Sequence, residues 1–556
     1  MSQKLNTFTR YCPGEEQIRI SDAVCIGRRR VHFHKCAGCQ FNDDERHLPV
    51  TATAQSAPPA PQHAESGPDE KPTSSLSRAG SLLPEPPARI NLNQRSPLAL
   101  PPRSATGRAL LMRQDDKLMI EKVFKAYDVR GTVPDQLNED AAWRIGNAAA
   151  QFLRTSLTGY DRSDEAKNTL IVGRDIRKHS PSLSHALIEG ARATGARVID
   201  IGLVDTSQIY FATNHLPCCG GVMVTASHNP ANYNGFKICG PKGKPIGQDT
   251  GLREICRIAV AISRHRVPET EPPRQVDLSM EYRAYLHRFL TPPRPMKVVI
   301  DASNGSAGRW FPILFSNVPN LTVIPLNFEH NGDFTHPPNP LVAANLDQLR
   351  AAVREHSADF GACFDGDADR CMFVDEKAGI VRCDVLTALL AGEYLRERPG
   401  STVVYDLRSS RAVPDAIRKA GGIPRRERVG HVFMKRTMAE HDAVFGGELS
   451  GHFYFRDFFY CDSGLFAFVA VLNLMTRTGR PLSELLAPHE TYFASGEQNF
   501  ENPDKDATVQ YADWWFNVRA SNTEPLLRLN MEASSVELLN RRMAELSPML
   551  GKQVDH

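Results

Sequence analysis

The sequence lacks a net charge that would attract an oppositely charged partner. Lysine and arginine together number 66 of the 556 residues, against 64 aspartates and glutamates. Such a balance provides no general attraction to nucleic acid or to an anionic membrane. We therefore expect no nucleic-acid or membrane partner, and any anion that the chain binds must be held by a local site.

Long hydrophobic runs are also missing. The N-terminal segment MSQKLNTFTRYCPGEEQ contains no apolar core of the kind that a secretory signal requires. The longest apolar run, LFAFVAVLNLM at 465–475, is too short to span a bilayer and is typical of a buried helix. We therefore expect a cytoplasmic protein whose 12 cysteines are reduced thiols.

The first 49 residues are rich in metal-binding side chains. His32 and His34 lie close to a C-x2-C pair, and the cysteines of this stretch are Cys12, Cys25, Cys36 and Cys39. Because so short a stretch cannot bury a large core, a structural Zn²⁺ would help it to fold. C-x2-C is a common half of a zinc site, but Cys12 and Cys25 are widely separated. The alternative is a flexible tail with incidental thiols.

Residues 50–112 contain few large apolar side chains. The segment QSAPPAPQHAESGPDEKPTSSLSRAG is rich in proline, alanine and serine and shows no hydrophobic periodicity. Such a composition cannot bury enough surface to offset chain entropy, so we predict a disordered linker.

From about residue 117, strand-like runs alternate with amphipathic helical runs. TLIVG (169–173), KVVID (297–301) and STVVYDL (401–407) each begin such a block. This alternation predicts α/β layers with mainly parallel strand pairing, and three blocks in a row indicate similar domains side by side. The last block, which contains ADWWFNVRASNTEPLLRLNMEA, has adjacent strand-like runs and favours an α+β domain.

A short apolar strand ends in a cluster of polar residues in MVTASHNPAN (223–232). Ser227 and His228 follow the strand-like residues Val222, Met223 and Val224 almost directly. A serine at the end of a rigid strand can perform chemistry or cap a turn. These residues alone leave both interpretations open.

The segment CFDGDADRCMFVD (363–375) carries three alternating carboxylates, Asp365, Asp367 and Asp369. In an extended segment such residues point the same way, and the resulting cluster calls for a cation. Oxygen ligands suit Mg²⁺ or Ca²⁺. Glu376 falls at the twelfth position of an EF-hand loop, but the sixth position is Arg370 instead of the required glycine, so we reject that motif. A solvated acidic turn is the other alternative.

Three further segments combine polar side chains. FGGELSGHF (445–453) places Glu448, Ser450 and His452 on one side of a loop, which suits a polyol, although a turn with a satisfied histidine fits equally well. It is not the G-x-S-x-G elbow of a hydrolase. VRASNTEPLLRL (518–529) forms a polar turn that suits a phosphate group, with a plain turn as the alternative. FKAYDVRG (124–131) places Tyr127 and Arg130 at the start of the folded region.

Four of these motifs, TASHNPANYNGFKI, DGDADR, GGELSGH and RASNTEP, occur in the order that is typical of the α-D-phosphohexomutases. The chain resembles the bacterial phosphomannomutase/phosphoglucomutase members over residues 117–556. The resemblance implies three similar α/β domains and a smaller α+β domain around a central cleft. The expected domains are I (117–272, phosphoserine loop), II (273–380, metal loop), III (381–486, sugar-binding loop) and IV (487–556, phosphate-binding loop).

The resemblance also implies a role for each motif. Ser227 would be the phosphoserine, and its phosphate would bind Mg²⁺ together with Asp365, Asp367 and Asp369. Lys237, Arg130 and His228 would act beside the reacting group. The implied substrate contacts are Tyr127, Arg370, His431, Glu448, Ser450, His452, Arg519, Ser521, Asn522 and Thr523.

The implied reaction interconverts hexose 6-phosphate and hexose 1-phosphate of mannose or glucose through a hexose 1,6-bisphosphate. Three departures from the family stand out. The segment between NFENPDKDATVQ and the phosphate loop is short, so we expect domain IV to lack a helix and a strand. Arg408 stands where a lysine is common, and residues 1–112 lie outside the resemblance.

Other functions are compatible with parts of this pattern. Glucosamine phosphate is the alternative substrate within the family. A non-catalytic sugar-phosphate binding protein would explain a shortened fourth domain. A phosphatase forming an aspartyl-phosphate would use the strand before Asp365, but it leaves Ser227 and the phosphate loop unexplained.

Overall fold

A computed structural model describes residues 10–11, 19–20, 117–156, 163–265, 271–501, 507–511, 513–520 and 526–554. The chain divides into two compact units, 1–98 and 99–556. In the first unit, the described residues form two short antiparallel strands, β1 (Arg10–Tyr11) and β2 (Arg19–Ile20). The four predicted zinc ligands and the predicted linker lie outside the described residues.

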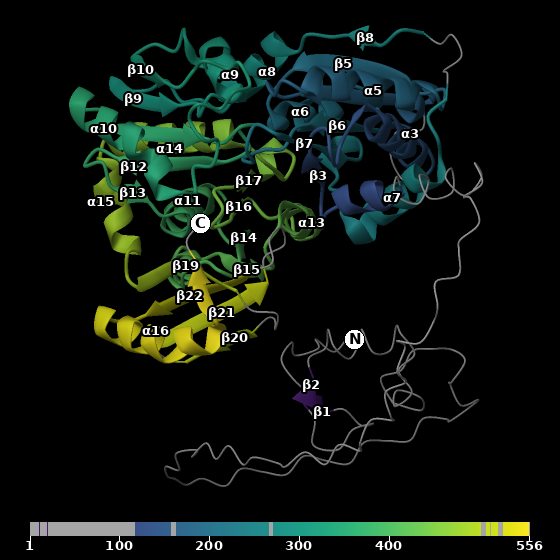
Figure 1. The fold of residues 1–556 in the computed structure, drawn as a ribbon. Coiled ribbons are helices and arrows are strands. Elements are labelled where there is room, and N and C mark those ends of the chain that lie inside the picture. Colours follow the sequence, from purple (N-terminus) through teal and green to yellow (C-terminus); the bar gives the residue numbers. More distant parts are fainter. Residues whose placement is uncertain are drawn as a thin grey trace, which may run out of the picture. The chain divides into compact units, whose positions relative to one another are not determined.

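The first α/β block of the second unit contains a six-stranded sheet in the order β3-β7-β6-β4-β5-β8. Strands β3, β5, β6, β7 and β8 of this block are labelled in Figure 1. The strands are β3 (Val129–Thr132), β4 (Thr169–Arg174), β5 (Arg197–Leu203), β6 (Gly220–Val224), β7 (Tyr233–Cys239) and β8 (Arg274–Gln275). The helices are α3 (Glu139–Ser156), α4 (Asp164–Asn168), α5 (Ser180–Arg192), α6 (Thr206–His215) and α7 (Leu252–Ala261). Strand β4 pairs in parallel with β5 and β6, whereas β7 is antiparallel to both β6 and β3.

Alternate residues of strand β4 explain why helices cover both faces of this sheet. Ile171 belongs to the core that contains Ile209 of α6, whereas Leu170 and Val172 belong to the core that contains Trp143 of α3. Successive side chains of a strand point to opposite faces, so a strand that is apolar throughout must be buried on both sides.

The next two blocks each contain a five-stranded sheet, and the two sheets have the same strand order. One sheet is β10-β9-β11-β12-β13 and the other is β15-β14-β16-β17-β18. The strands are β9 (Met296–Asp301), β10 (Leu321–Leu326), β11 (Phe360–Phe364), β12 (Cys371–Asp375), β13 (Ile380–Val381), β14 (Thr402–Asp406), β15 (Ile423–Glu427), β16 (Phe445–Gly447), β17 (Phe453–Phe455) and β18 (Cys461–Asp462). In each, three parallel strands are extended by antiparallel ones, as in the first sheet. The predicted similarity of three α/β domains is confirmed.

Eight α-helices accompany these two sheets within the described residues. They are α8 (Ser279–His287), α9 (Ser306–Phe315), α10 (Asp347–His356), α11 (Cys383–Glu397), α12 (Ala412–Lys419), α13 (His431–Glu440), α14 (Gly464–Thr478) and α15 (Leu482–Leu486), together with short 3₁₀ turns such as Ala487–His489. The apolar run predicted to be a buried helix is α14, and Leu465, Phe468 and Leu472 on it are fully buried. None of the described helices is long and apolar enough to span a membrane.

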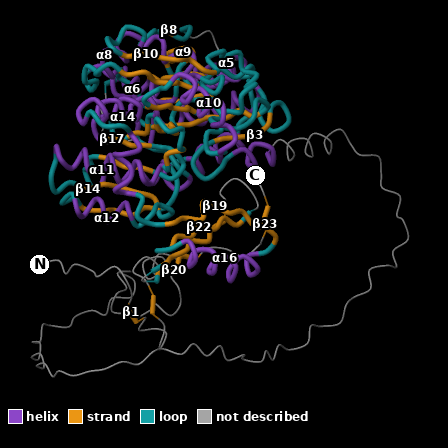
Figure 2. Tube along the Cα trace, turned by 90° about the vertical axis from the view of Figure 1, so that its left-hand side faces the viewer, coloured by secondary structure: helices purple, strands orange, loops and turns teal. Residues whose placement is uncertain are grey.

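The last block is an antiparallel sheet in the order β20-β21-β22-β19-β23, with helix α16 (Val536–Leu550) packed against it (Figure 2). The strands are β19 (Phe493–Glu501), β20 (Ala507–Gln510), β21 (Trp514–Ala520), β22 (Leu527–Ala533) and β23 (Lys552–Val554). Leu538 and Leu539 of α16 pack with Trp514 and Met531 in a small separate core. The predicted α+β character of this block is confirmed.

Candidate active site

Ser227 lies in the loop that follows strand β6, and its side chain is aimed at the acidic loop of the second block. Its Oγ donates a hydrogen bond to Asp365 Oδ2 at 2.6 Å. The residue is 1% exposed and adopts a left-handed φ of 51°. Its backbone N–H donates to Thr225 Oγ1 at 2.9 Å. Ser227 is therefore held in a conformation that is uncommon for a residue with a side chain.

The acidic loop follows strand β11 and brings three carboxylates together. Asp365, Asp367 and Asp369 are buried, and one oxygen of each lies within 4.8 Å of the others. The expected extended geometry is wrong: the segment is a tight turn, with Ala368 at a φ of 58°. The convergence arises because the turn folds the carboxylates inward. Gly366 is required because a Cβ there would lie 2.4 Å from the Ser227 carbonyl oxygen.

Basic side chains surround these carboxylates. Lys237 on β7 donates to Asp367 Oδ2 at 2.8 Å and also to Asp369 Oδ2. Arg370 Nε lies 3.8 Å from Asp365 Oδ2. Arg130 on β3 donates to Asn229 in the Ser227 loop at 2.6 Å. The strands of the first sheet thus deliver positive charge to the carboxylate turn of the second block.

Burial makes the ionisation of the carboxylates interdependent. Removal from water, and then the negative charges of Asp369 and Asp367, raise the pKa of Asp365 well above its usual range. Burial alone would lower the pKa of Lys237, but the carboxylates of Asp367 and Asp369 raise it. Among the described residues, Oδ1 of Asp367 has no hydrogen-bond partner. Closely spaced buried oxygens with an unused acceptor fit a hard divalent cation.

Burial favours the neutral ring of two histidines near Ser227 and the three aspartates. Burial, followed by the positive charges of Arg370 and Arg130, holds the pKa of His228 well below its usual range. Burial and the nearby Lys435 have the same effect on the pKa of His431. The rings of His431 and Tyr127 meet edge to face at 5.4 Å between centroids. His228 Nδ1 lies 3.3 Å from Ser227 Oγ.

The third block adds a carboxylate, a hydroxyl and an imidazole. Glu448 Oε1 accepts from Gly430 N–H at 2.9 Å, and Oε2 accepts from Tyr454 O–H at 2.5 Å. Ser450 Oγ lies 2.9 Å from His452 Nδ1. His452 also forms an isolated bridge with the backbone of Arg370, which joins this loop to the acidic turn.

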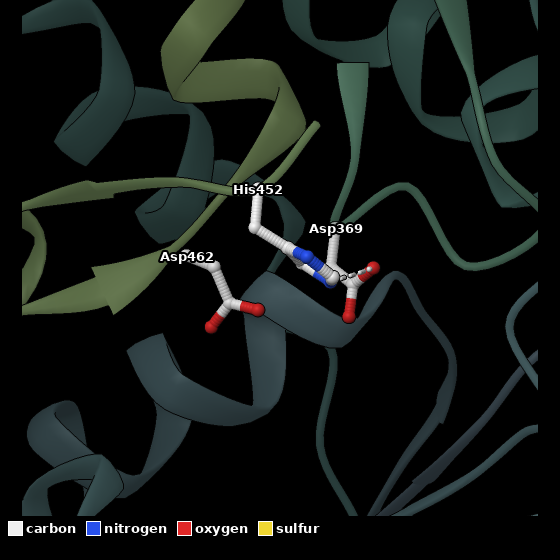
Figure 3. Close-up of side chains that lie close together, drawn as sticks. All are labelled: Asp369, His452 and Asp462. Carbon is white, nitrogen blue, oxygen red and sulfur yellow. Dashed lines mark ion pairs between the residues drawn. The ribbon is translucent and has the colours of Figure 1, made fainter. Parts of the chain in front are cut away.

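Asp369, His452 and Asp462 form a second group of possible metal ligands, which shares Asp369 with the aspartate turn. Figure 3 shows Asp369, His452 and Asp462 close together, and His452 Nε2 is 3.5 Å from Asp369 Oδ1. Lys435 Nζ lies 2.6 Å from Asp462 Oδ1 and 3.8 Å from the centroid of the Tyr210 ring. The ammonium group of Lys435 already supplies positive charge here, so this group is a poorer metal site than the aspartate turn.

The C-terminal sheet brings Arg519 to a separate cavity. Arg519 lies on β21, at the end that precedes the predicted phosphate loop, and Ser521, Asn522 and Thr523 lie outside the described residues. Arg519 and Tyr127 line a cavity of about 870 Å³. The same cavity is lined by the basic residues Lys242, Lys244, Arg428 and Arg436. Such a surface favours anionic ligands.

Sequence reasoning missed two buried residues that position this site. Thr206, at the start of α6, donates to Asp367 Oδ2 at 2.6 Å across 161 positions of sequence. Arg177 donates to the Ser227 carbonyl oxygen at 2.7 Å. Each residue stands in a polar segment that follows an apolar strand, Arg177 in GRDIRKHS and Thr206 in DTSQ, but neither segment indicates which distant residue it contacts.

Comparisons with known proteins agree with this architecture. Models of the phosphoglucomutase/phosphomannomutase family match all four blocks: α/β/α domain I at residues 121–266, domain II at 281–379, domain III at 383–492 and the C-terminal domain at 499–548. The fold is therefore that of a phosphohexomutase.

Individual relatives extend the likeness over most of the chain. "Phosphohexose mutases" from Xanthomonas campestris pv. campestris (strain B100) is 40% identical over 77% of this chain and 98% of its own length. "Phosphomannomutase" from Escherichia coli (strain K12) is 38% identical over 77% and 99%. A crystal structure of a phosphoglucomutase/phosphomannomutase family protein from Burkholderia thailandensis is 30% identical, with a TM-score of 0.68 over 77% of this chain and 96% of that one. The chain belongs to the phosphoglucomutase/phosphomannomutase family and is a phosphohexomutase.

Proposed function

We propose that the protein interconverts the 6-phosphate and the 1-phosphate of mannose and of glucose, with Ser227 as the phosphoryl carrier. The observation that carries this proposal is the hydrogen bond of 2.6 Å between Ser227 Oγ and Asp365, inside a cluster of three buried carboxylates. A hydroxyl fixed at a cation site can hold a phosphoryl group whose charge the cation offsets. A serine that only capped a turn would have no need of such surroundings.

Asp365, Asp367 and Asp369 would hold Mg²⁺ together with an oxygen of the Ser227 phosphate. When bound, the ion would supply charge neutralisation for the transferring group. Lys237 and Arg130 would add positive charge from the neighbouring strands. Arg370 and His228 would line the same pocket, with His228 present as a neutral ring.

The first half-reaction breaks the bond between Ser227 Oγ and phosphorus and forms a bond between phosphorus and the free hydroxyl of the sugar phosphate. The hydroxyl loses a proton and Ser227 Oγ gains one; we assign to the Lys237 ammonium group the donation to Ser227 Oγ, after which it regains a proton from the sugar hydroxyl. The second half-reaction returns the other phosphoryl group of the hexose 1,6-bisphosphate to Ser227. The sugar must turn over in the cleft between the two steps.

The remaining contacts would hold the substrate in both orientations. Glu448, Ser450 and His452 would bind sugar hydroxyls, with His431 and Tyr127 at the wall of the cleft. Arg519 would bind the phosphate that is not being transferred, together with Ser521, Asn522 and Thr523. A guanidinium group suits this task because it can bind two phosphate oxygens at once.

Assays with purified protein test the substrate assignment. Mannose 1-phosphate, glucose 1-phosphate and glucosamine 1-phosphate are supplied in turn with hexose 1,6-bisphosphate, and formation of the 6-phosphate is followed. We expect turnover of the mannose and glucose compounds. Preference for the glucosamine compound would assign the alternative substrate, and tight binding without turnover would identify a binding protein.

A further inference from the structure

The buried side chain of Arg177 donates all five of its N–H groups to the protein. Arg177 is 1% exposed and follows strand β4 in the first block. Its Nη atoms donate to the carbonyl oxygens of Ser227 (2.7 Å), Asn229 (2.7 Å), Pro230 (2.6 Å) and Tyr233 (3.1 Å). Its Nε donates to Asp175 Oδ2 at 3.1 Å.

These acceptors are the backbone of the loop that presents Ser227. Residues 225–232 lie between β6 and β7 and are not part of a strand, so their buried carbonyl groups need donors other than a regular sheet ladder. One rigid planar group satisfies three of them, together with the carbonyl group of Tyr233, from the inside of the loop. The position of Ser227, including its left-handed φ of 51°, is therefore tied to the position of the guanidinium.

The second block closes over the same arginine. The ring of Phe334 lies 4.7 Å from the Arg177 guanidinium carbon, and Lys178 forms an ion pair with Asp333. A Cβ on Gly332 would come within 2.7 Å of the Ile176 carbonyl oxygen, so the two segments are in close contact. Arg177 thus lies where the serine loop meets the block that carries the acidic turn.

We propose that Arg177 is a positioning residue that holds Ser227 Oγ in line with the reacting phosphoryl group. This inference rests on the proposed function of Ser227. Arg177 touches neither the sugar nor the phosphate in this role; it acts through the backbone of residues 227–233. Misplacing a reacting group by about 1 Å lowers a rate by about 100-fold.

A lysine cannot reproduce this arrangement. Its ammonium group has three donors at one point, whereas the four carbonyl oxygens are reached by two Nη atoms of a planar fork. Lysine keeps the positive charge and most of the aliphatic stem. Arg177→Lys therefore changes the arrangement of the hydrogen-bond donors while the positive charge is kept.

The test compares Arg177→Lys with Arg154→Lys in the full-length protein. Arg154 is the control because it is an arginine of the first block that donates to Asn168 and to the Thr194 carbonyl oxygen, away from the serine loop, although it is less buried than Arg177. For Arg177→Lys we expect kcat to fall by about 100-fold with KM changed less than about twofold, since the substrate contacts are untouched. The control should keep its kcat. Thermal unfolding is recorded for both variants.

A second variant covers the case in which Arg177→Lys does not fold. Asp175→Asn keeps the shape of the side chain but weakens the hold on Arg177 Nε, and it should lower kcat in the same direction by about tenfold. Unchanged kcat in a folded Arg177→Lys or in Asp175→Asn would overturn the proposal. Equal losses in the Arg154→Lys control would also overturn it, since they would show a general effect on stability.

Intact-mass measurement of the wild-type protein separates this inference from the proposed function. If Ser227 carries a phosphate and the Arg177 variants keep full kcat, the positioning role alone is wrong. If Ser227 carries no phosphate after incubation with hexose 1,6-bisphosphate, the proposed function fails and the inference fails with it.

Discussion

The serine–aspartate centre and the C-terminal sheet are built in different ways. The centre lies among the first three blocks, and one continuous hydrophobic core extends from Ile171 in the first block to Leu486 in the third. The C-terminal sheet has two small cores of its own, which contain residues between Phe500 and Leu550. Its described links to the third block include hydrogen bonds of Arg411 to Glu532 and to the Trp514 carbonyl oxygen.

This difference suits the centre to phosphoryl transfer and the C-terminal sheet to substrate binding. A continuous core fixes the distance between Ser227 and Asp365, as transfer of a phosphoryl group requires. Polar contacts contribute about 0.5–1.5 kcal/mol each and exchange readily with water. We therefore expect changes at the centre to remove the chemistry, and changes in the C-terminal sheet to weaken binding while leaving the chemistry possible.

The largest effect on the rate should come from the carboxylate turn. Asp367→Asn keeps the shape of the side chain but removes one charge from the cation site, so kcat should fall by about 100-fold or more. Asp375→Asn, at the far end of strand β12, is the matched control and should have little effect. Chelation should abolish wild-type activity, and added Mg²⁺ should restore it. Full activity in a metal-free preparation would contradict the assignment.

Arg519→Ala should have the next largest effect, because it removes a charged hydrogen bond to the distal phosphate. A loss of about 1.5–3 kcal/mol lowers kcat/KM by about 10- to 100-fold. Free hexose 1,6-bisphosphate should accumulate as the weakly held intermediate escapes. Arg541→Ala removes the same charge from the exposed side of α16 and serves as the control. An unchanged kcat/KM for both the 1- and 6-phosphates would show that Arg519 does not bind the phosphate.

A smaller effect concerns stability near the centre. Burial raises the pKa of Asp205, which caps helix α6 by accepting from Gln208 N–H, from 3.8 to about 7. Because the folded-state pKa is raised, protonated Asp205 stabilises the folded state. This contribution to the free energy of unfolding is full below about pH 4 and is lost as the pH rises through 7. The free energy of unfolding should fall by up to about 1.4 kcal/mol per pH unit in this window. Asp205→Asn should remove that slope, as measured by urea unfolding at several pH values; a pH-independent difference from wild type would contradict this.

The smallest effect should come from the N-terminal region. A chain that begins at residue 113 should keep the kcat/KM of the full-length protein, because the four family domains lie within 121–548. Elemental analysis of the full-length protein should find zinc bound by Cys12, Cys25, Cys36 and Cys39. An absence of zinc would reject the metal site, and a loss of activity on truncation would assign the N-terminal region a part in catalysis.

The sequence predicted the residues of the site better than the strand pairing and the long-range contacts that hold them in place. Alternating strands and helices indicated three α/β blocks, and the motifs indicated Ser227, the aspartate turn and Lys237. The strand order could not be predicted, because short apolar strands such as β4 and β6 carry no information about which neighbours they pair with. Thr206 and Arg177 were missed for a related reason: each acts on residues that are distant in sequence, and no local pattern marks such a contact.

The central claim is that Ser227 carries the phosphoryl group, and intact-mass spectrometry tests it most directly. Wild-type protein and Ser227→Ala are incubated with hexose 1,6-bisphosphate, freed of small molecules and weighed. The account predicts one phosphate on the wild type, located at Ser227 by fragmentation, and none on the variant, which should also lose nearly all turnover. A phosphorylated or fully active Ser227→Ala protein would contradict it.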